Sequence, residues 1–159
     1  MTLEIPVTTA VRMLRDHKVN FEPFFYEYEE KGGTTVSARE LGVPEHSIIK
    51  TLIMEDENKK PLIVLMHGDK QLSAKQLARE LKVKTIKPSE PEVANRHSGY
   101  VVGGTSPFAT KKTMPVIMQK TILDLPHIWI NGGKRGFLIK LEPTAVVKLL
   151  QPQLLDVQA

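Results

Sequence analysis

The chain has 159 residues, a net charge of +4 and no cysteine, which excludes a disulfide framework, a thiolate zinc site and a cysteine nucleophile. Its hydrophobic fraction of 41% and charged fraction of 25% are typical of globular proteins, and no apolar run approaches the roughly 20 residues of a membrane span. We therefore expect one domain over residues 1–159. Residues 1–6 lack the basic start and apolar core of a secretion signal, so we expect a cytoplasmic protein.

The first part of the chain predicts two helices with a strand between them. Val7, Val11 and Leu14 repeat at helical spacing, which indicates an amphipathic helix. Ser37 and Glu40 have the spacing of a capping box, which indicates the start of a second, two-turn helix. In order, we predict a helix ending near residue 17, an aromatic-rich strand over 21–28, a glycine-containing loop over 31–34 and a helix that Gly42 and Pro44 close.

The middle of the chain predicts a buried hairpin followed by a helix. Two apolar, β-branched runs are joined by a charged turn, and Lys50 lies inside the first run. Ser73 and Gln76 form a second capping-box pattern ahead of an apolar helical repeat. The predicted elements are strands over 48–54 and 61–66 and a helix that follows Ser73 and includes Leu81.

Short helices and strands alternate through the rest of the chain, which predicts an α+β fold with a mixed sheet. We expect a helix over 91–96, strands over 115–118, 127–130 and 137–141, a helix after Pro143 that runs through Leu150, and a polar tail to Ala159.

Positive charge is concentrated in the second half of the chain. Residues 111–148 contain seven lysines and arginines against two acids, a net of +5. Such a surface favours a polyanionic partner such as nucleic acid, although a solvated lysine-rich face has the same composition.

Several kinds of active site find no support in the sequence. The five histidines are scattered without metal-ligand spacing, so we predict no metal site. Ser98 and Ser106 do not lie in a G-x-S-x-G elbow, and Ser106, which precedes Pro107, is better explained by a turn. The glycine-rich segments do not match either common nucleotide-binding loop, and no cofactor is indicated.

Two features suggest a site. Lys50 is a cation within an apolar run, where it either enters a cleft or faces outward from a one-sided strand. The pair Gly103 and Gly104 allows the backbone to approach a ligand and to present N–H groups to an oxyanion, although a tight turn uses glycines equally well. The same alternatives apply to the segment 131–133.

Three segments resemble a known family when taken together. They are SIIKTLIM at residues 47–54, SGYVVGGTSPF at 98–108 and INGGKRGF at 130–137, and in this order and spacing they are similar to the YbaK family of aminoacyl-tRNA deacylases. The family includes the editing domain inserted in many bacterial prolyl-tRNA synthetases, and the similarity covers nearly the whole chain. It implies a single α+β domain with a curved, barrel-like mixed sheet and flanking helices.

The resemblance also implies an activity and a set of residues. Family members clear tRNA(Pro) that carries a wrong small amino acid, so mischarged tRNA, bound by its acceptor end, and prolyl-tRNA synthetase are the implied partners. For a cysteinyl ester, the family is thought to let the substrate thiol attack its own ester. The implied catalytic residues are Lys50, Gly103 and Gly104, and the implied substrate-binding residues are Tyr26, Thr51, Ser106, Asn131, Gly132, Gly133 and Lys134.

Two positions depart from the family pattern. Asn131 stands where YbaK has serine, and Leu138 stands where some members carry an acid that would attract the substrate amine. The amino acid that is removed therefore stays open between cysteine, alanine and another small residue. Two other hypotheses are a non-catalytic adaptor that binds tRNA or a synthetase, and a hydrolase of other small acyl esters.

Overall fold

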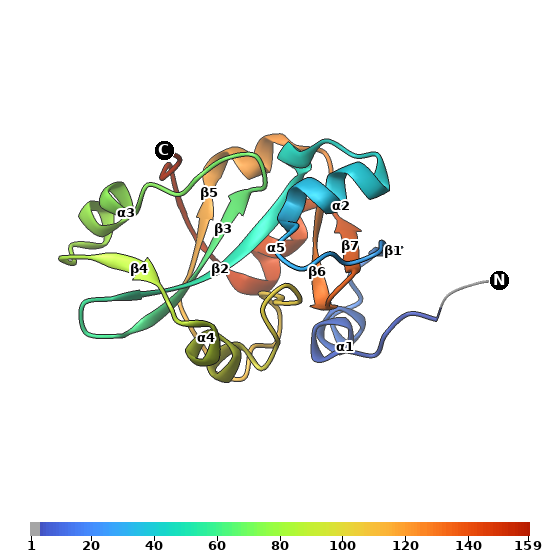
Figure 1. Cartoon of the computed structure of the whole chain (residues 1–159), viewed down its shortest axis with the longest axis horizontal. Coiled ribbons are helices and arrows are strands. Elements are labelled where there is room, and N and C mark those ends of the chain that lie inside the picture. Colours follow the sequence, from blue (N-terminus) through green and yellow to red (C-terminus); the bar gives the residue numbers. More distant parts are fainter. Residues whose placement is uncertain (1–3) are drawn as a thin grey trace.

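The computed structural model describes residues 4–159 of the chain (Figure 1). Its helices are α1 (Thr9–Asp16), α2 (Gly33–Leu41), α3 (Ala74–Leu81), α4 (Pro91–Ser98) and α5 (Pro143–Leu150), with short 3-10 helices η1 (Glu45–Ser47) and η2 (Lys120–Asp124). Its strands are β1 (Glu22–Phe25), β2 (Ile48–Asp56), β3 (Pro61–His67), β4 (Ile86–Pro88), β5 (Val116–Gln119), β6 (Ile128–Lys134), β7 (Phe137–Leu141) and β8 (Gln153–Leu155).

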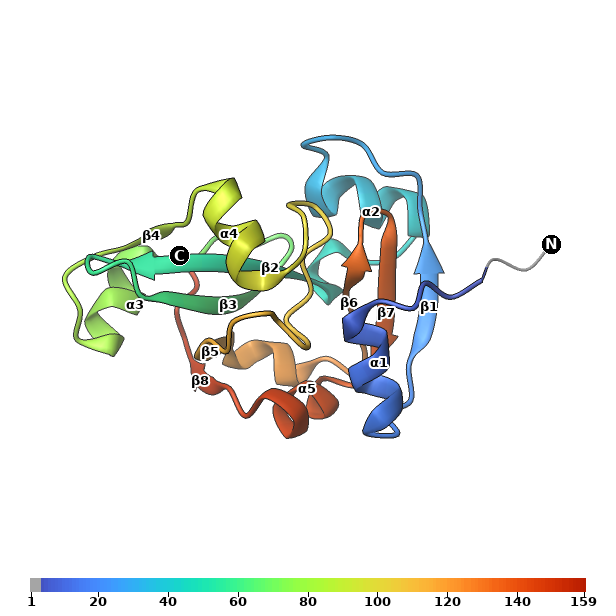
Figure 2. The same ribbon diagram turned by 90° about the horizontal axis from the view of Figure 1, so that it is seen from below.

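All eight strands belong to one mixed sheet, which confirms the predicted α+β class. The strand order is β1-β7-β6-β2-β3-β5-β8, and β4 pairs with one end of β2. The long β2–β3 hairpin extends away from the group formed by β6, β7 and β1 (Figures 1 and 2). Within residues 4–159 the terminal strands β1 and β8 do not pair, so the sheet does not close into a barrel.

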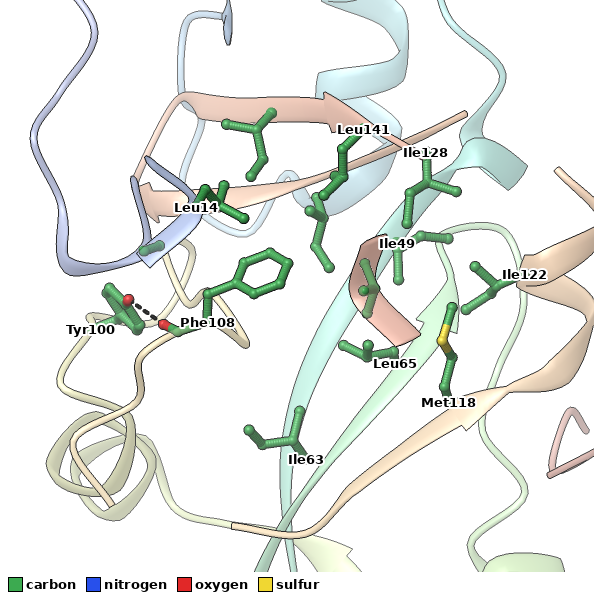
Figure 3. Close-up of a cluster of buried hydrophobic side chains, with 14 of the residues drawn as sticks. Leu14, Ile49, Ile63, Leu65, Tyr100, Phe108, Met118, Ile122, Ile128 and Leu141 are labelled. Carbon is green, nitrogen blue, oxygen red and sulfur yellow. Dashed lines mark hydrogen bonds between the residues drawn. The ribbon is translucent and has the colours of Figure 1, made fainter. Parts of the chain in front are cut away.

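The hairpin separates two hydrophobic clusters because successive side chains of a strand point to opposite faces. One cluster includes Ile49, Ile63 and Leu65, against which α1 and α5 pack (Figure 3). The other includes Val64 and Met66 on the opposite face, together with Leu77 and Ala78 of α3. Each fully buried aliphatic side chain stabilises the fold by about 1.5–3 kcal/mol, so both faces of this hairpin are strongly anchored.

Most predicted helices are confirmed, and α2 shows the largest error. The α3 helix begins where the capping pattern placed it, since the Ser73 hydroxyl accepts a hydrogen bond from the Gln76 backbone N–H at 3.2 Å. The α2 helix instead starts at Gly33, inside the segment predicted as a loop. Ser37 does not cap it, because its hydroxyl donates to the Thr34 carbonyl at 3.1 Å within the helix.

The chain end and the second glycine motif also differ from the prediction. The expected polar tail contains β8, which pairs in parallel with β5, and Val157 beyond it is fully buried. Gly132 and Gly133 lie within β6 and not in a loop, at a bulge between Asn131 and Lys134. Across residues 4–159, no helix combines the length and apolar character required to cross a bilayer.

Candidate functional site

The central strand β2 has an unpaired stretch on one edge. It pairs with β6 only at Ile48 and Ile49, and with β4 only at residues 54–56. The Ile48 carbonyl accepts from Gly68 N on the β3 side, whereas the Ile53 carbonyl accepts from Ser89 N on the other side. Backbone groups alternate in direction along such a strand. The N–H and carbonyl of Thr51 therefore face the gap between β6 and β4.

A cavity of about 940 Å³ runs along this gap. Its wall includes residues 48–54 of β2, parts of α2 and α4, and the loops that precede α2 and follow α4. Lys50 and Thr51 both line it, although they point to opposite faces of the strand. Thr51 shares its face with Ile49 and Ile53 of the first cluster, and Lys50 shares the other with Leu52 and Met54. The cavity thus wraps around the open edge of β2.

Lys50 is half-buried in the cavity wall and does not face outward into solvent. Its ammonium donates a hydrogen bond to the Lys70 carbonyl. Burial lowers the pKa of Lys50, while the nearby carboxylates of Glu45 and Asp69 act in the opposite direction. A partly desolvated ammonium interacts strongly with an ester oxygen or a phosphate, because little water screens it.

The loop that supplies the Lys70 carbonyl is fastened by a histidine pair. The His46 and His67 rings stack at a centroid distance of 3.7 Å, and His46 Nδ1 lies 2.8 Å from Asp69 Oδ1. His67 is fully buried, which lowers its pKa, and its ring nitrogens contact the His46 carbonyl at 2.8 Å and Thr121 Oγ1 at 2.7 Å. No group of three or more potential metal ligands occurs among the residues that the structure describes.

The two glycines of the 103–104 motif have different environments. Gly103 lines the cavity, has a φ of +90°, and a Cβ at this position would lie 2.5 Å from the Tyr28 hydroxyl oxygen. Its N–H has no acceptor among the described residues and is the candidate oxyanion donor. Gly104 lies outside the cavity lining, and its N–H donates to the Val101 carbonyl at 2.8 Å. Gly104 is closely packed, since a Cβ there would lie 2.7 Å from Arg135 N.

Asn131 connects the two glycine motifs. Its side-chain oxygen accepts from Gly133 N at 2.6 Å and Lys134 N at 3.1 Å, and its amide nitrogen donates to the Gly103 carbonyl at 3.2 Å. Asn131 thereby shapes the bulge in β6 and fixes the loop beside the cavity.

The remaining predicted residues divide into two groups. Tyr26 and Thr51 line the cavity, and burial raises the pKa of the Tyr26 phenol. Four predicted substrate-binding residues do not line it. Ser106 is fully buried and accepts from Phe108 N at 3.2 Å, which is the structural role of a turn serine. Gly132 packs against Phe137, and Gly133 packs against Tyr100 and Thr8. Lys134 is exposed to solvent outside the cavity.

Sequence analysis did not single out Arg135, Tyr28 or Ser89, which also line the cavity. The Arg135 guanidinium lies 5.0 Å from the centre of the Tyr28 ring, and its Nε donates to the Val102 carbonyl at 2.9 Å. These contacts fasten the 102–104 loop, and both residues could have been inferred from their motif neighbours Lys134 and Tyr26. Ser89 also lines the cavity, but it belongs to no motif and gave no signal.

Comparison with known proteins defines the class. The model of the aminoacyl-tRNA editing domain family matches residues 29–149. The chain therefore belongs to this family, the editing hydrolases that deacylate aminoacyl-tRNA, as its sequence motifs predicted.

Among its relatives, EbsC of Enterococcus faecalis, a candidate Cys-tRNA(Pro)/Cys-tRNA(Cys) deacylase, is 28% identical over 94% of this chain and 92% of its own. The proline–tRNA ligase of Streptococcus equi subsp. zooepidemicus is 26% identical over 61% of this chain. The matched region covers only 16% of the length of the ligase. A solved candidate trans-editing enzyme for prolyl-tRNA synthetase has the same fold, with a TM-score of 0.82 and 19% identity over 98% of this chain and 99% of that one.

Proposed function

We propose that this protein hydrolyses the ester of mischarged tRNA(Pro), with cysteinyl-tRNA(Pro) as the first candidate substrate and alanyl-tRNA(Pro) as the second. The observation that carries the proposal is the meeting of Lys50, Thr51 and Gly103 along the unpaired edge of β2. The similarity to EbsC and to the proline–tRNA ligases supports the choice of tRNA. We also propose that residues 1–159 form one editing domain that acts in the cytoplasm, with prolyl-tRNA synthetase as a partner.

The volume of the cavity supports an aminoacylated nucleoside as the ligand. A small amino acid would occupy only part of the 940 Å³, so the terminal adenosine of the acceptor end fits in the same space. Lys50 would hold a ribose or phosphate oxygen and polarise the ester carbonyl, and the Gly103 N–H would stabilise the charge that develops on the carbonyl oxygen.

The reaction needs an attacking group from outside the protein. Water can add to the carbonyl carbon, after which the bond to the ribose oxygen breaks and the amino acid and a free tRNA hydroxyl leave. With a cysteinyl ester, the substrate thiol can attack its own carbonyl, which releases the tRNA and forms a cyclic thioester. Both routes place negative charge on the carbonyl oxygen, where Lys50 and Gly103 would act.

Deacylation assays with tRNA(Pro) charged with cysteine, alanine or proline test this proposal. We expect the cysteinyl or alanyl ester to be lost faster than in buffer while the prolyl ester persists. Equal half-lives with and without protein for both mischarged substrates would refute the activity on tRNA(Pro).

An adaptor without catalytic activity is the second candidate function. Leu138, which is 4% exposed, gives the cavity an apolar wall where some family members carry an acid, and this observation favours it. Tight tRNA binding without any acceleration of ester loss would support the adaptor.

A further inference from the structure

Two hydroxyls in the cavity have no hydrogen-bond partner. Thr51 Oγ1 and Ser89 Oγ are buried atoms that no group within residues 4–159 contacts as donor or acceptor. Both residues line the cavity. Buried polar atoms are normally paired, so two unpaired hydroxyls in one cavity indicate a place for a polar group of a ligand.

The backbone of Ser89 pairs with the β2 edge near Thr51. Ser89 N donates to the Ile53 carbonyl at 3.0 Å, and Ile53 shares its strand face with Thr51. Two residues of strand rise separate Thr51 from Ile53, or about 7 Å. A small polar group seated between the two residues would lie near both hydroxyls and beside the Thr51 carbonyl, which faces the gap. This pocket wall therefore offers three oxygen acceptors.

Within residues 4–159, the charged residues that line the cavity are three cations, Lys31, Lys50 and Arg135, and two acids. Glu29 and Glu30, at the exposed loop before α2, are the acids among the described residues that line the cavity, and Leu138 supplies no charge. Lys50 points to the opposite face of β2, so a ligand ammonium is repelled from that face. An ammonium has three N–H donors, which match the three acceptors on the Thr51 face.

We propose that Thr51 and Ser89 bind the α-ammonium of the aminoacyl group, with Ser89 as a specificity-determining residue for acyl groups that carry a free amine. The inference rests on the proposed function, because it assumes an aminoacyl ester in this cavity. It extends that function by predicting that an acyl group without the amine loses the contribution of Ser89.

A pair of stable analogues tests the subsite by binding alone. Alanine and propionate, each joined through an amide to 3′-amino-3′-deoxyadenosine, differ only in the α-amine and are not esters. Calorimetry should show that Ser89→Ala weakens binding of the alanyl analogue about 10-fold, the typical effect of losing a hydrogen bond to a charged group. Binding of the propionyl analogue should change less than about twofold.

Two further variants serve as controls, with thermal melting to verify folding. Ser89→Thr keeps the hydroxyl and should retain most of the affinity for the alanyl analogue. Ser37→Ala removes a cavity hydroxyl that already donates to the Thr34 carbonyl, and it should affect both analogues equally.

The subsite would be overturned if Ser89→Ala weakened binding of both analogues equally. It would also be overturned if the wild-type protein bound neither analogue, or bound both with equal affinity. A wild type that binds the alanyl analogue through Ser89 but leaves mischarged tRNA(Pro) intact would refute the proposed hydrolysis and keep the subsite.

Discussion

Two cavities of this molecule contain charged residues, and they differ in how firmly hydrogen bonds and ion pairs hold those residues. Along β2, Lys50 is held by a backbone carbonyl and the 102–104 loop by Arg135 and Asn131. A second cavity, of about 610 Å³, lies between the end of α1, β1 and α5, and its charged groups include Lys18, Lys140 and Lys148. Of these lysines, Lys18 and Lys148 belong to no ion pair among the described residues, and Lys140 Nζ lies 4.0 Å from Glu22 Oε2.

This comparison shows that a concentration of basic residues does not by itself locate the site. Of the seven basic residues in the segment 111–148, Arg135 lines the cavity along β2, whereas Lys140 and Lys148 line the second one. What distinguishes the β2 cavity is a gap in the sheet, where backbone groups and fixed side chains converge. The following predictions test whether activity follows this geometry or the positive charge.

Gly103→Ala should produce the largest loss among the variants that leave Lys50 in place. The added Cβ would meet the Tyr28 hydroxyl at 2.5 Å and adopt a φ of +90°, so the loop must shift away from its position beside the cavity. Displacing a loop that positions the substrate by about 1 Å can cost about 100-fold in kcat/KM. Gly42→Ala is the matched control, because Gly42 has a φ of +66° and no atom within 4 Å of the new Cβ. The control should lose about 1 kcal/mol of stability and keep its activity.

The charge state of Lys50 should set the alkaline limit of activity. Burial lowers its pKa, so the wild type should lose the ammonium, and with it activity, at a pH below the ordinary 10.5 of a lysine. Lys50→Arg keeps its charge through this range, and the ratio of wild-type to variant rate should fall about 10-fold per pH unit above that pKa. Rates are corrected for spontaneous ester loss, and a pH-independent ratio would contradict the role of the charge.

The same pKa shift predicts a change in stability with the opposite trend. Between the lowered folded pKa and the unfolded value, the unfolded chain binds more protons, so the free energy of unfolding should rise with pH. Denaturant unfolding of wild type and Lys50→Arg over this range measures the difference, which should disappear in the variant.

Arg135→Ala should have a moderate effect on activity. It removes the contact with the Tyr28 ring and the hydrogen bond to the Val102 carbonyl, both of which are exposed to solvent. A loss of about 1 kcal/mol corresponds to a roughly fivefold decrease in kcat/KM. Arg12→Ala, an exposed arginine of α1, should leave kcat/KM unchanged. Equal decreases in the two variants would indicate a general effect of charge.

Removing charge from the second cavity should have the smallest effect. Lys18→Ala and Lys148→Ala should each change kcat/KM less than about twofold, because screened surface charges contribute little. A larger loss that grows at low salt would instead place this cavity in the tRNA footprint.

Local sequence patterns predicted the central hairpin, and together with the family resemblance they singled out Lys50, but they predicted only part of the cavity. A charge within an apolar strand is costly unless it has a partner, which made Lys50 a candidate, and its place in the first of the three family motifs favoured a role in the site. The sequence did not predict Ser89 as a cavity residue, and it did not predict the gap along the edge of β2. The gap depends on where β6 and β4 stop pairing with β2, which is a property of the tertiary structure. The β8 strand was missed because Gln153 and Leu154 are exposed and lack an alternating pattern.

The most direct test of the central claim is single-turnover deacylation by Lys50→Met and Lys148→Met. Methionine approximates the apolar stem of lysine without its charge. If the cavity along β2 is the active site, Lys50→Met should lose about 100-fold or more in rate on the mischarged tRNA(Pro) that the wild type cleaves, and Lys148→Met should match the wild type. Wild-type rates in Lys50→Met, with both variants folded, would contradict the account.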